Sequence, residues 1–253
     1  MRRFAGGFFL GHFMKIIQKI SEKSKDLFGK PAATIAFLGD SVTQGCFEIY
    51  EIEPGRIETV FDRNSAYHTY LGQILTKLYP SATVNIINAG ISGDNAPNGF
   101  NRLERDVLRY SPDLVVVCFG LNDSGLGLQG IGQYTSALNN IFVSLKEHNI
   151  EIIFMTPNTM CTHVSPNLNF ELGRNVAAGL ASIQNDGILD KYIEEAVKLC
   201  ERENVKVCDC YSLWKKMEKN GVNTTELLAN YVNHPDREMN KLFAFKLAET
   251  MFE

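Results

Sequence analysis

Short apolar runs separated by amphipathic segments are the feature that most limits the fold of this 253-residue chain. The runs have strand length and are continuous in hydrophobicity rather than alternating, which is typical of strands buried on both faces of a parallel sheet. The expected strands are Thr34–Leu38, Val84–Asn88, Leu114–Phe119, Ile150–Met155 and Val205–Val207. We therefore expect an α/β fold, a single layered domain whose mostly parallel five-stranded sheet carries helices on both faces.

The segments between these runs have helical periodicity. Five apolar residues from Tyr67 to Leu78 are spaced by three and four, so they share one helix face, and Pro80 ends the pattern. Other helices are expected at Met14–Phe28, Phe100–Tyr110, Ile131–His148, Asp186–Glu203 and Asp236–Phe252. Two long stretches, Cys46–Arg63 and Pro157–Arg174, have neither pattern; we expect irregular loops that either frame a pocket or decorate the surface.

The first thirty residues differ from the rest, and we divide the chain into an N-terminal extension with an amphipathic helix (1–30) and a main domain (31–253). An arginine pair precedes an apolar stretch, Phe4–Met14, which imitates a signal peptide. Glycines and His12 interrupt that stretch, and no small-residue cleavage site follows. We expect a cytoplasmic protein that starts at Met14, with a signal peptide or a membrane-associated N-terminus as the alternative.

Composition excludes several classes of protein. Apolar residues make up 45% and charged residues 21% of the chain, which is typical of an ordinary globular protein. The net charge of −4 argues against a nucleic-acid partner, and no apolar run is long enough for stable membrane insertion. Six cysteines are expected to be mostly reduced thiols, because a chain of this length and aliphatic content needs no disulfide scaffold. Cys200, Cys208 and Cys210 lack the paired spacing of a zinc site.

Polar motifs follow the first three strands, where a parallel sheet binds its ligands. Residues 39–45 (GDSVTQG) place Ser41 directly after the first strand. The motif lacks the lysine of a phosphate-binding loop and the second glycine of a nucleophile elbow. What remains is a serine at a helix N-terminus, where main-chain N–H groups favour an oxyanion or an anionic ligand.

The neighbouring strand ends supply groups that suit a serine nucleophile. Gly93 follows the second strand and Asn122 the third, and a glycine N–H and an asparagine amide can both donate to an oxyanion. A base is also needed, and His234 lies in a polar loop just before the last helix. His163, in the second long loop, is the competing histidine.

These four blocks together resemble the SGNH (GDSL-type) hydrolases, whose marker residues match Ser41, Gly93, Asn122 and His234 in order. The resemblance implies a flavodoxin-like three-layer α/β/α fold and ester hydrolysis without a cofactor or metal. It also implies that Ser41 is the nucleophile and His234 the general base. The N–H groups of Ser41 and Gly93 and the side chain of Asn122 would then form the oxyanion hole. We expect the adjacent Asp40 and Asp123 to support the site.

One position departs from the family pattern. Members usually carry an aspartate three residues before the histidine, where this chain has Tyr231. The imidazole could instead be oriented by a main-chain carbonyl near Tyr231, or by Asn230, Asn233 or Asp236, of which Asp236 is the least favourably placed. The remaining alternative is weak or absent catalysis.

The predicted function is hydrolysis of short acyl esters, such as acetyl groups on a carbohydrate or similar polar alcohol, through an acyl-serine. Alternatives are a lipid hydrolase of the lysophospholipase or thioesterase type, an acyltransferase, and a binding protein that lost the triad acid. The oligomeric state is not predicted. A dinucleotide fingerprint at residues 125–130 (GLGLQG) is discounted, because it does not follow a strand directly.

Overall fold

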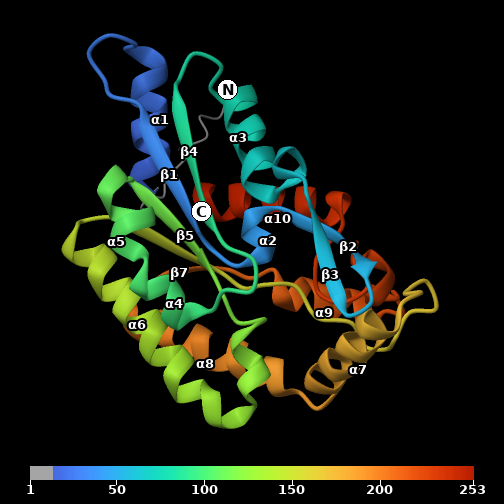
Figure 1. Cartoon of the computed structure of the whole chain (residues 1–253). Helices are drawn as coiled ribbons and strands as arrows, with labels where there is room; N and C mark the ends of the chain where they lie inside the picture. The colour runs from blue at the N-terminus through green and yellow to red at the C-terminus, as the bar shows by residue number, and fades with distance from the viewer. Residues whose placement is uncertain (1–13) are drawn as a thin grey trace, which may run out of the picture.

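A five-stranded parallel sheet forms the middle layer of the computed structural model, which describes residues 14–253 (Figure 1). The signal-like residues before Met14 lie outside the described residues. The strand order is β4-β1-β5-β6-β7, and every neighbouring pair is parallel. The strands are β1 (Ala33–Gly39), β4 (Val84–Gly90), β5 (Leu114–Cys118), β6 (Glu151–Met155) and β7 (Lys206–Cys208). The expected α/β sheet is confirmed, with strand ends shifted by one or two residues.

Helices cover both faces of this sheet. On one face, Phe37 of β1 and Phe243 of α10 both pack their rings against Tyr67 of α3. On the other face, Phe142 of α6 packs against Phe154 of β6, and α4 and α8 flank α6. The helices are α1 (Lys15–Lys25), α2 (Ser41–Gln44), α3 (Tyr67–Leu78), α4 (Ala96–Asn101), α5 (Leu103–Asp106), α6 (Ile131–Glu147), α7 (Glu171–Asn185), α8 (Ile188–Glu203), α9 (Tyr211–Lys219) and α10 (Arg237–Phe252).

The prediction that Cys46–Arg63 is an irregular loop is wrong. Residues 46–61 form an antiparallel hairpin of β2 (Cys46–Glu53) and β3 (Arg56–Phe61), with Gly55 at a positive φ of 84° in the turn. Only the first two residues of β2 are buried, so the exposed remainder carries many polar side chains and lacks a clear strand pattern. In Figure 1 the hairpin stands beside α2, near the ends of the strands.

Three helical regions also differ from expectation. The predicted helix Phe100–Tyr110 is broken, because Arg102 leaves helical backbone between α4 and α5. The second predicted loop ends at Phe170, where α7 begins. The buried face of α7 consists of Gly173, Ala177, Ala181 and Gln184, residues too small or too polar to produce a strong hydrophobic period. Helix α9 was likewise not expected.

The register of the sheet brings three strand ends together. Gly39 at the end of β1 pairs with Gly90 of β4 on one side and with Cys118 of β5 on the other. The loops after these strands therefore open at one edge. Gly90 permits a close approach there, since a Cβ atom at this position would lie 2.3 Å from the main-chain nitrogen of Gln44 in α2.

Two further expectations concern the whole described chain. All six cysteines are buried free thiols, as expected for reduced residues. Between residues 14 and 253, none of the helices has the length and apolar character needed to span a lipid bilayer.

Candidate active site

Ser41 and His234 meet at the edge of the sheet where the strands end. Ser41 is the first residue of α2, immediately after β1, and His234 precedes α10 at the other end of the chain. The His234 Nε2 atom lies 2.9 Å from the Ser41 Oγ atom, and both side chains are buried. The two residues are thus within hydrogen-bond distance, as a nucleophile and its base must be.

The other nitrogen of the imidazole bonds to the main chain. His234 Nδ1 lies 2.9 Å from the carbonyl oxygen of Phe47, the second residue of β2. A carbonyl oxygen can only accept, so Nδ1 carries the proton in neutral imidazole and Nε2 keeps its lone pair. Ser41 Oγ–H can therefore donate to Nε2, which is the arrangement that general-base catalysis requires.

The loop before His234 is held by a different set of bonds. Asn230 Oδ1 accepts the main-chain N–H groups of Val232, Asn233 and His234 at 2.9–3.0 Å. Asn158, which follows β6, donates its Nδ2–H to the carbonyl of Asn233 at 2.9 Å. The expected imidazole partners Asn230, Asn233 and Tyr231 thus shape or belong to the loop, and within residues 14–253 the ring nitrogens bond to Phe47 and Ser41 instead. Asp236 instead caps α10.

Burial controls the protonation of His234. Loss of hydration in this closed position lowers the pKa of His234 from 6.5 to about 4, and the Phe47 carbonyl offsets part of that decrease by favouring the imidazolium. The imidazole is therefore neutral at neutral pH. A neutral imidazole is the form that can accept the serine proton.

Gly93 and Asn122 lie in the two loops beside Ser41 and are tied to each other. Asn122 Nδ2–H donates to the carbonyl oxygen of Asp94 at 2.7 Å, so the residue after Gly93 is bonded to the asparagine side chain. The second hydrogen of the same amide stays available to another acceptor. Gly93 is exposed, has a positive φ of 78°, and faces open space on its side-chain side. Gly93 and Asn122 thus lie in neighbouring loops that are held together by the carbonyl of Asp94.

Asp40 and Asp123 are buried carboxyl groups of the same region. Asp40 Oδ1 accepts the Val42 N–H at 3.0 Å and caps α2, while Asp123 Oδ1 accepts the Ala96 N–H at 2.9 Å and holds the start of α4. Burial raises the pKa of Asp40 to about 7 and that of Asp123 to about 6. Each carboxyl group therefore supports an element that carries or adjoins a predicted site residue.

The sequence did not identify Phe47 as a site residue. Its contribution is a main-chain carbonyl, which every residue has, so no side-chain signature could have pointed to it. The competing His163 is exposed and contacts Thr162 and Thr225. The glycines of residues 125–130 lie in or between two 3₁₀ turns that separate β5 from α6, which confirms that they do not join a strand directly to a helix.

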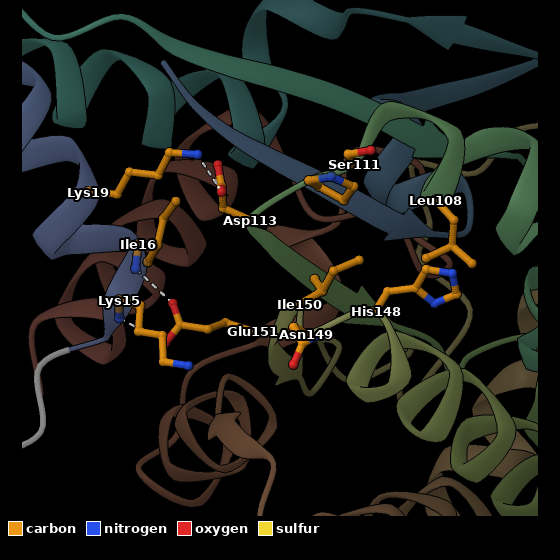
Figure 2. A pocket seen from close by; sticks show the side chains of 11 residues that line it. Lys15, Ile16, Lys19, Leu108, Ser111, Asp113, His148, Asn149, Ile150 and Glu151 are labelled. Atoms are coloured by element: carbon orange, nitrogen blue, oxygen red, sulfur yellow. Dashed lines mark hydrogen bonds and ion pairs between the residues drawn. The ribbon is translucent and has the colours of Figure 1, made fainter. Parts of the chain in front are cut away.

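A separate hollow of about 390 Å³ lies at the opposite edge of the sheet, where β5 and β6 begin (Figure 2). Glu151 accepts the main-chain N–H groups of Lys15 and Ile16 there, and the Lys19 ammonium pairs with Asp113. These contacts fasten α1 to the sheet. Among the described residues, no three His, Cys, Asp or Glu side chains are grouped closely enough to hold a metal ion.

Comparisons with known proteins identify the family of this chain. The model of the GDSL-like Lipase/Acylhydrolase family matches residues 37–242. An acetylxylan esterase of Geobacillus stearothermophilus is 26% identical over 132 residues, which are 49% of this chain and 58% of the relative. An arylesterase of Vibrio mimicus is 35% identical over 74 residues, 28% of this chain and 36% of the relative. The matched part of this chain thus spans less than two thirds of either relative.

Two solved structures share the fold. A catalytic mutant of an acetylxylan esterase from Geobacillus stearothermophilus superimposes with a TM-score of 0.64 at 19% identity, covering 88% of this chain and 97% of that one. A putative GDSL-like lipase from Parabacteroides merdae gives a TM-score of 0.67 at 23% identity, covering 88% and 96%. The three-layer α/β/α architecture expected from the sequence is therefore confirmed.

Proposed function

Because the chain belongs to the GDSL-like lipase/acylhydrolase family, we propose that it is a carboxylic ester hydrolase that uses Ser41 as nucleophile and His234 as general base. The observation that carries this proposal is the bond of 2.9 Å between Ser41 Oγ and a buried imidazole nitrogen whose tautomer is set for proton acceptance. Fold similarity alone would not support it, since one fold hosts many chemistries.

The reaction follows from these positions. Ser41 Oγ attacks the acyl carbon while its proton passes to His234 Nε2, and the carbonyl oxygen becomes an oxyanion. The Gly93 N–H and the Asn122 amide, together with the Ser41 N–H, stabilise that oxyanion. Collapse breaks the bond to the alcohol oxygen, which takes the proton from His234. Water then repeats the sequence on the acyl-serine and releases the carboxylic acid.

The third member of the usual triad is replaced by the main chain in this proposal. The Phe47 carbonyl orients the ring and stabilises the imidazolium as the dipole of a neutral group, where an aspartate would do so with a full charge. This acceptor argues against a binding protein that lost catalysis along with the acid. We expect a slower enzyme than one with an aspartate, because a dipole stabilises imidazolium less than a charge does.

The test is hydrolysis of p-nitrophenyl acetate by the wild type and by Ser41→Ala, with Ser92→Ala as the matched control. Ser92 lies two residues from the end of β4, and its hydroxyl is exposed. We expect Ser41→Ala to lose at least about 10³-fold in kcat and Ser92→Ala to stay within twofold. A fluorophosphonate should label Ser41 of the wild type, as read by peptide mass spectrometry. Wild-type turnover by Ser41→Ala would refute the nucleophile.

Acetyl groups on a carbohydrate are the proposed substrate. The proposal is supported by the acetylxylan esterase among the relatives, although that match covers only 49% of this chain. Polar exposed residues on the segment that follows β6, such as Asn167, Asn169 and Glu171, also suit a polar alcohol. Acetylated xylo-oligosaccharides and p-nitrophenyl esters from acetyl to octanoyl should be compared. Peak activity on octanoyl or on a lysophospholipid would overturn the acetyl-carbohydrate assignment.

A further inference from the structure

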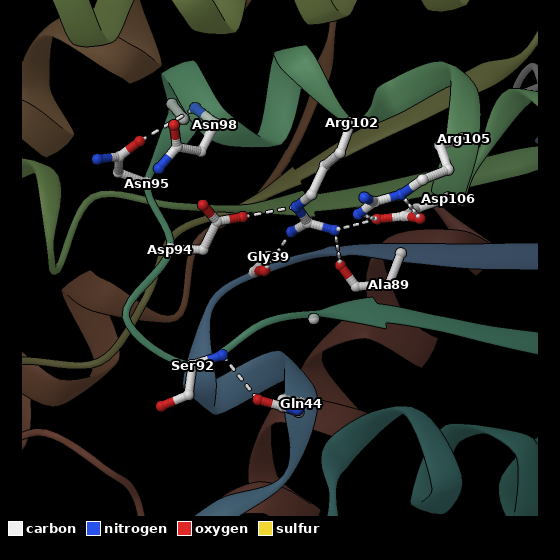
Figure 3. A network of polar contacts seen from close by, with 12 residues as sticks. Gly39, Gln44, Ala89, Ser92, Asp94, Asn95, Asn98, Arg102, Arg105 and Asp106 are labelled. Carbon is white, nitrogen blue, oxygen red and sulfur yellow. Dashed lines mark hydrogen bonds and ion pairs between the residues drawn. The ribbon is translucent and has the colours of Figure 1, made fainter.

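A single buried guanidinium joins three segments beneath the candidate oxyanion hole (Figure 3). Arg102, which is 7% exposed, sits at the break between α4 and α5 and reaches the ends of two strands. Its Nη2–H donates to the carbonyl of Gly39 at 2.9 Å and its Nη1–H to the carbonyl of Ala89 at 2.6 Å. Gly39 ends the strand that leads into Ser41, so Arg102 fixes the base of the nucleophile turn.

Asp94 connects this guanidinium to two of the three candidate oxyanion donors, Gly93 and Asn122. Its Oδ2 atom accepts Arg102 Nε–H at 2.6 Å, and its main-chain carbonyl accepts the Asn122 amide at 2.7 Å. Asp94 also follows Gly93 directly in the chain. One residue therefore receives Arg102 on its side chain and Asn122 on its backbone, so it holds the Asn122 side chain directly and is joined to Gly93 through the chain.

A second carboxylate on the same guanidinium lies away from the site. Asp106 Oδ2 is 3.3 Å from Arg102 Nη1, and its other partner is Arg105, which is exposed. The Asp106 side chain pairs with these two arginines and not with the loop of Gly93 or with Asn122. Asp94 and Asp106 both pair with Arg102, but only Asp94 belongs to the loop that carries Gly93. Variants of the two residues therefore distinguish loss of a partner of the guanidinium from displacement of the loop.

We propose that Arg102 and Asp94 are positioning residues for ester hydrolysis, which align the Gly93 N–H and the Asn122 amide with the oxyanion formed at Ser41. The inference rests on the proposed function. A planar guanidinium suits this task because it presents N–H groups in several fixed directions, whereas a lysine ammonium offers one point of charge. Two backbone carbonyls and the carboxylates of Asp94 and Asp106 are bound in this way at one centre.

The experiment measures kcat and KM for p-nitrophenyl acetate in the wild type, Asp94→Asn and Asp106→Asn. Removing one oxyanion donor typically costs 10²–10³-fold in kcat. We expect Asp94→Asn to lower kcat about 10- to 100-fold with KM changed less than about threefold, because the donors act on the transition state. Asp106→Asn should stay within twofold of the wild type. A folded Asp94→Asn with wild-type kcat would overturn the proposal.

A double-mutant cycle distinguishes positioning from a general structural effect. If Asp94 acts through Asn122, then Asp94→Asn/Asn122→Ala should lose little more than the larger single variant does, whereas independent effects would multiply. Multiplying effects therefore contradict the proposal. If Asp94→Asn does not fold, Arg102→Lys, which keeps the positive charge, takes its place with the same expected loss of kcat. Wild-type kcat in that variant would also be contradictory. An inactive wild type, or an active Ser41→Ala, would instead refute the proposed function.

Discussion

Two arginines support the two sides of the candidate active site in different ways. Arg102 is buried on the oxyanion side of the site, which holds Gly93 and Asn122. It donates hydrogen bonds to Asp94 and to two strand-end carbonyls. Arg237 is 36% exposed at the start of α10, where it pairs with Glu48 and Asp62 and lies 4.4 Å above the ring of Phe47. The first arginine is part of the protein interior, whereas the second fastens the β2–β3 hairpin from outside.

The difference shows how burial sets the importance of an ion pair. Water can replace the partners of Arg237, so that pairing adds little to stability. Water has poor access to Asp94, so removal of Arg102 leaves a buried carboxylate without its counter-charge. On the base side of the site, which holds His234 and Phe47, the exposed ion pairs of Arg237 are sufficient. The group that accepts from His234 Nδ1 there is the Phe47 carbonyl, which belongs to the backbone.

The largest expected effect is on folding stability. Arg102→Met should lower the free energy of unfolding by about 3–5 kcal/mol, because it breaks a buried pair from one side. Arg237→Met should lower it by about 1 kcal/mol or less, through loss of exposed pairs and one cation–π contact. Urea unfolding followed by circular dichroism measures both. Equal losses of unfolding free energy in the two variants would contradict the expectation that the buried arginine stabilises the fold more than the exposed one.

The pH dependence of kcat/KM tests the base side. His234 must be neutral to accept a proton, and its pKa lies at about 4, below the usual 6.5. We expect kcat/KM to stay level from pH 7 to about pH 5 and to fall about tenfold per pH unit below pH 4. A decrease centred near pH 6.5 would show that the imidazole is hydrated.

Folding must be monitored at each pH, because the same shift affects stability. Burial lowers the pKa of both His234 and His68 to about 4 in the folded chain. Between about pH 6.5 and pH 4 the unfolded chain therefore binds more protons, so these two residues reduce stability as the pH falls. Circular dichroism separates this loss of folded protein from protonation of His234, the proposed general base.

The sequence was sufficient for the parts of the fold that depend on strong hydrophobic patterns. Strand β5 is fully buried, and β1 and β6 are buried at all but one position, so they read as apolar runs. The outer strands β4 and β7 were also predicted, although they are only partly buried. The hairpin of residues 46–61 and helix α7 were missed for one reason. Their elements bury few large side chains, as the buried face of α7 with Gly173, Ala177 and Ala181 illustrates. Such faces carry little periodic signal.

The site divides in a similar way. Motifs at strand ends predicted that Ser41, Gly93 and Asn122 would lie close together, because parallel strands end at one edge. His234 lies in the loop before α10, and its meeting with Ser41 was predicted from the family resemblance. The partner of the imidazole could not be predicted, since a backbone carbonyl of Phe47, 187 positions away from His234, has no residue-specific mark. Arg102 falls within the predicted helix Phe100–Tyr110, so the sequence did not single it out. In the structure it lies at the break between α4 and α5, from where its side chain reaches the sheet.

A smaller effect on folding stability is expected from the buried carboxyl group of Asp40, on the oxyanion side. Burial and the nearby Asp123 and Asp94 raise the pKa of Asp40 to about 7. Since this folded pKa exceeds the unfolded value, ionised Asp40 costs stability as the pH rises through 7. Asp40→Asn keeps an oxygen for the Val42 N–H and should raise stability at pH 8 by on the order of 1–2 kcal/mol, less at pH 5.

Asp106→Asn is the matched control for the Asp40 variant. Hydrogen bonding by Arg105 lowers the pKa of Asp106, so ionised Asp106 contributes stability above the unfolded pKa. Its replacement should reduce stability slightly at pH 8, opposite in sign to Asp40→Asn. Thermal unfolding at pH 5 and pH 8 reads both variants. A destabilised Asp40→Asn at pH 8 would show that the carboxylate is stabilised by its surroundings.

The smallest effect is expected on the base side, at the position where the family usually has an aspartate. Tyr231 has a positive φ of 55°, a conformation that aspartate and asparagine both tolerate. Tyr231→Asp should change kcat/KM by less than about threefold, because the Phe47 carbonyl already accepts from His234 Nδ1. Tyr231→Asn controls for the backbone. A tenfold gain in the aspartate variant alone would mean that a side-chain charge can displace the carbonyl, and that the imidazole is held less firmly than the bond of 2.9 Å implies.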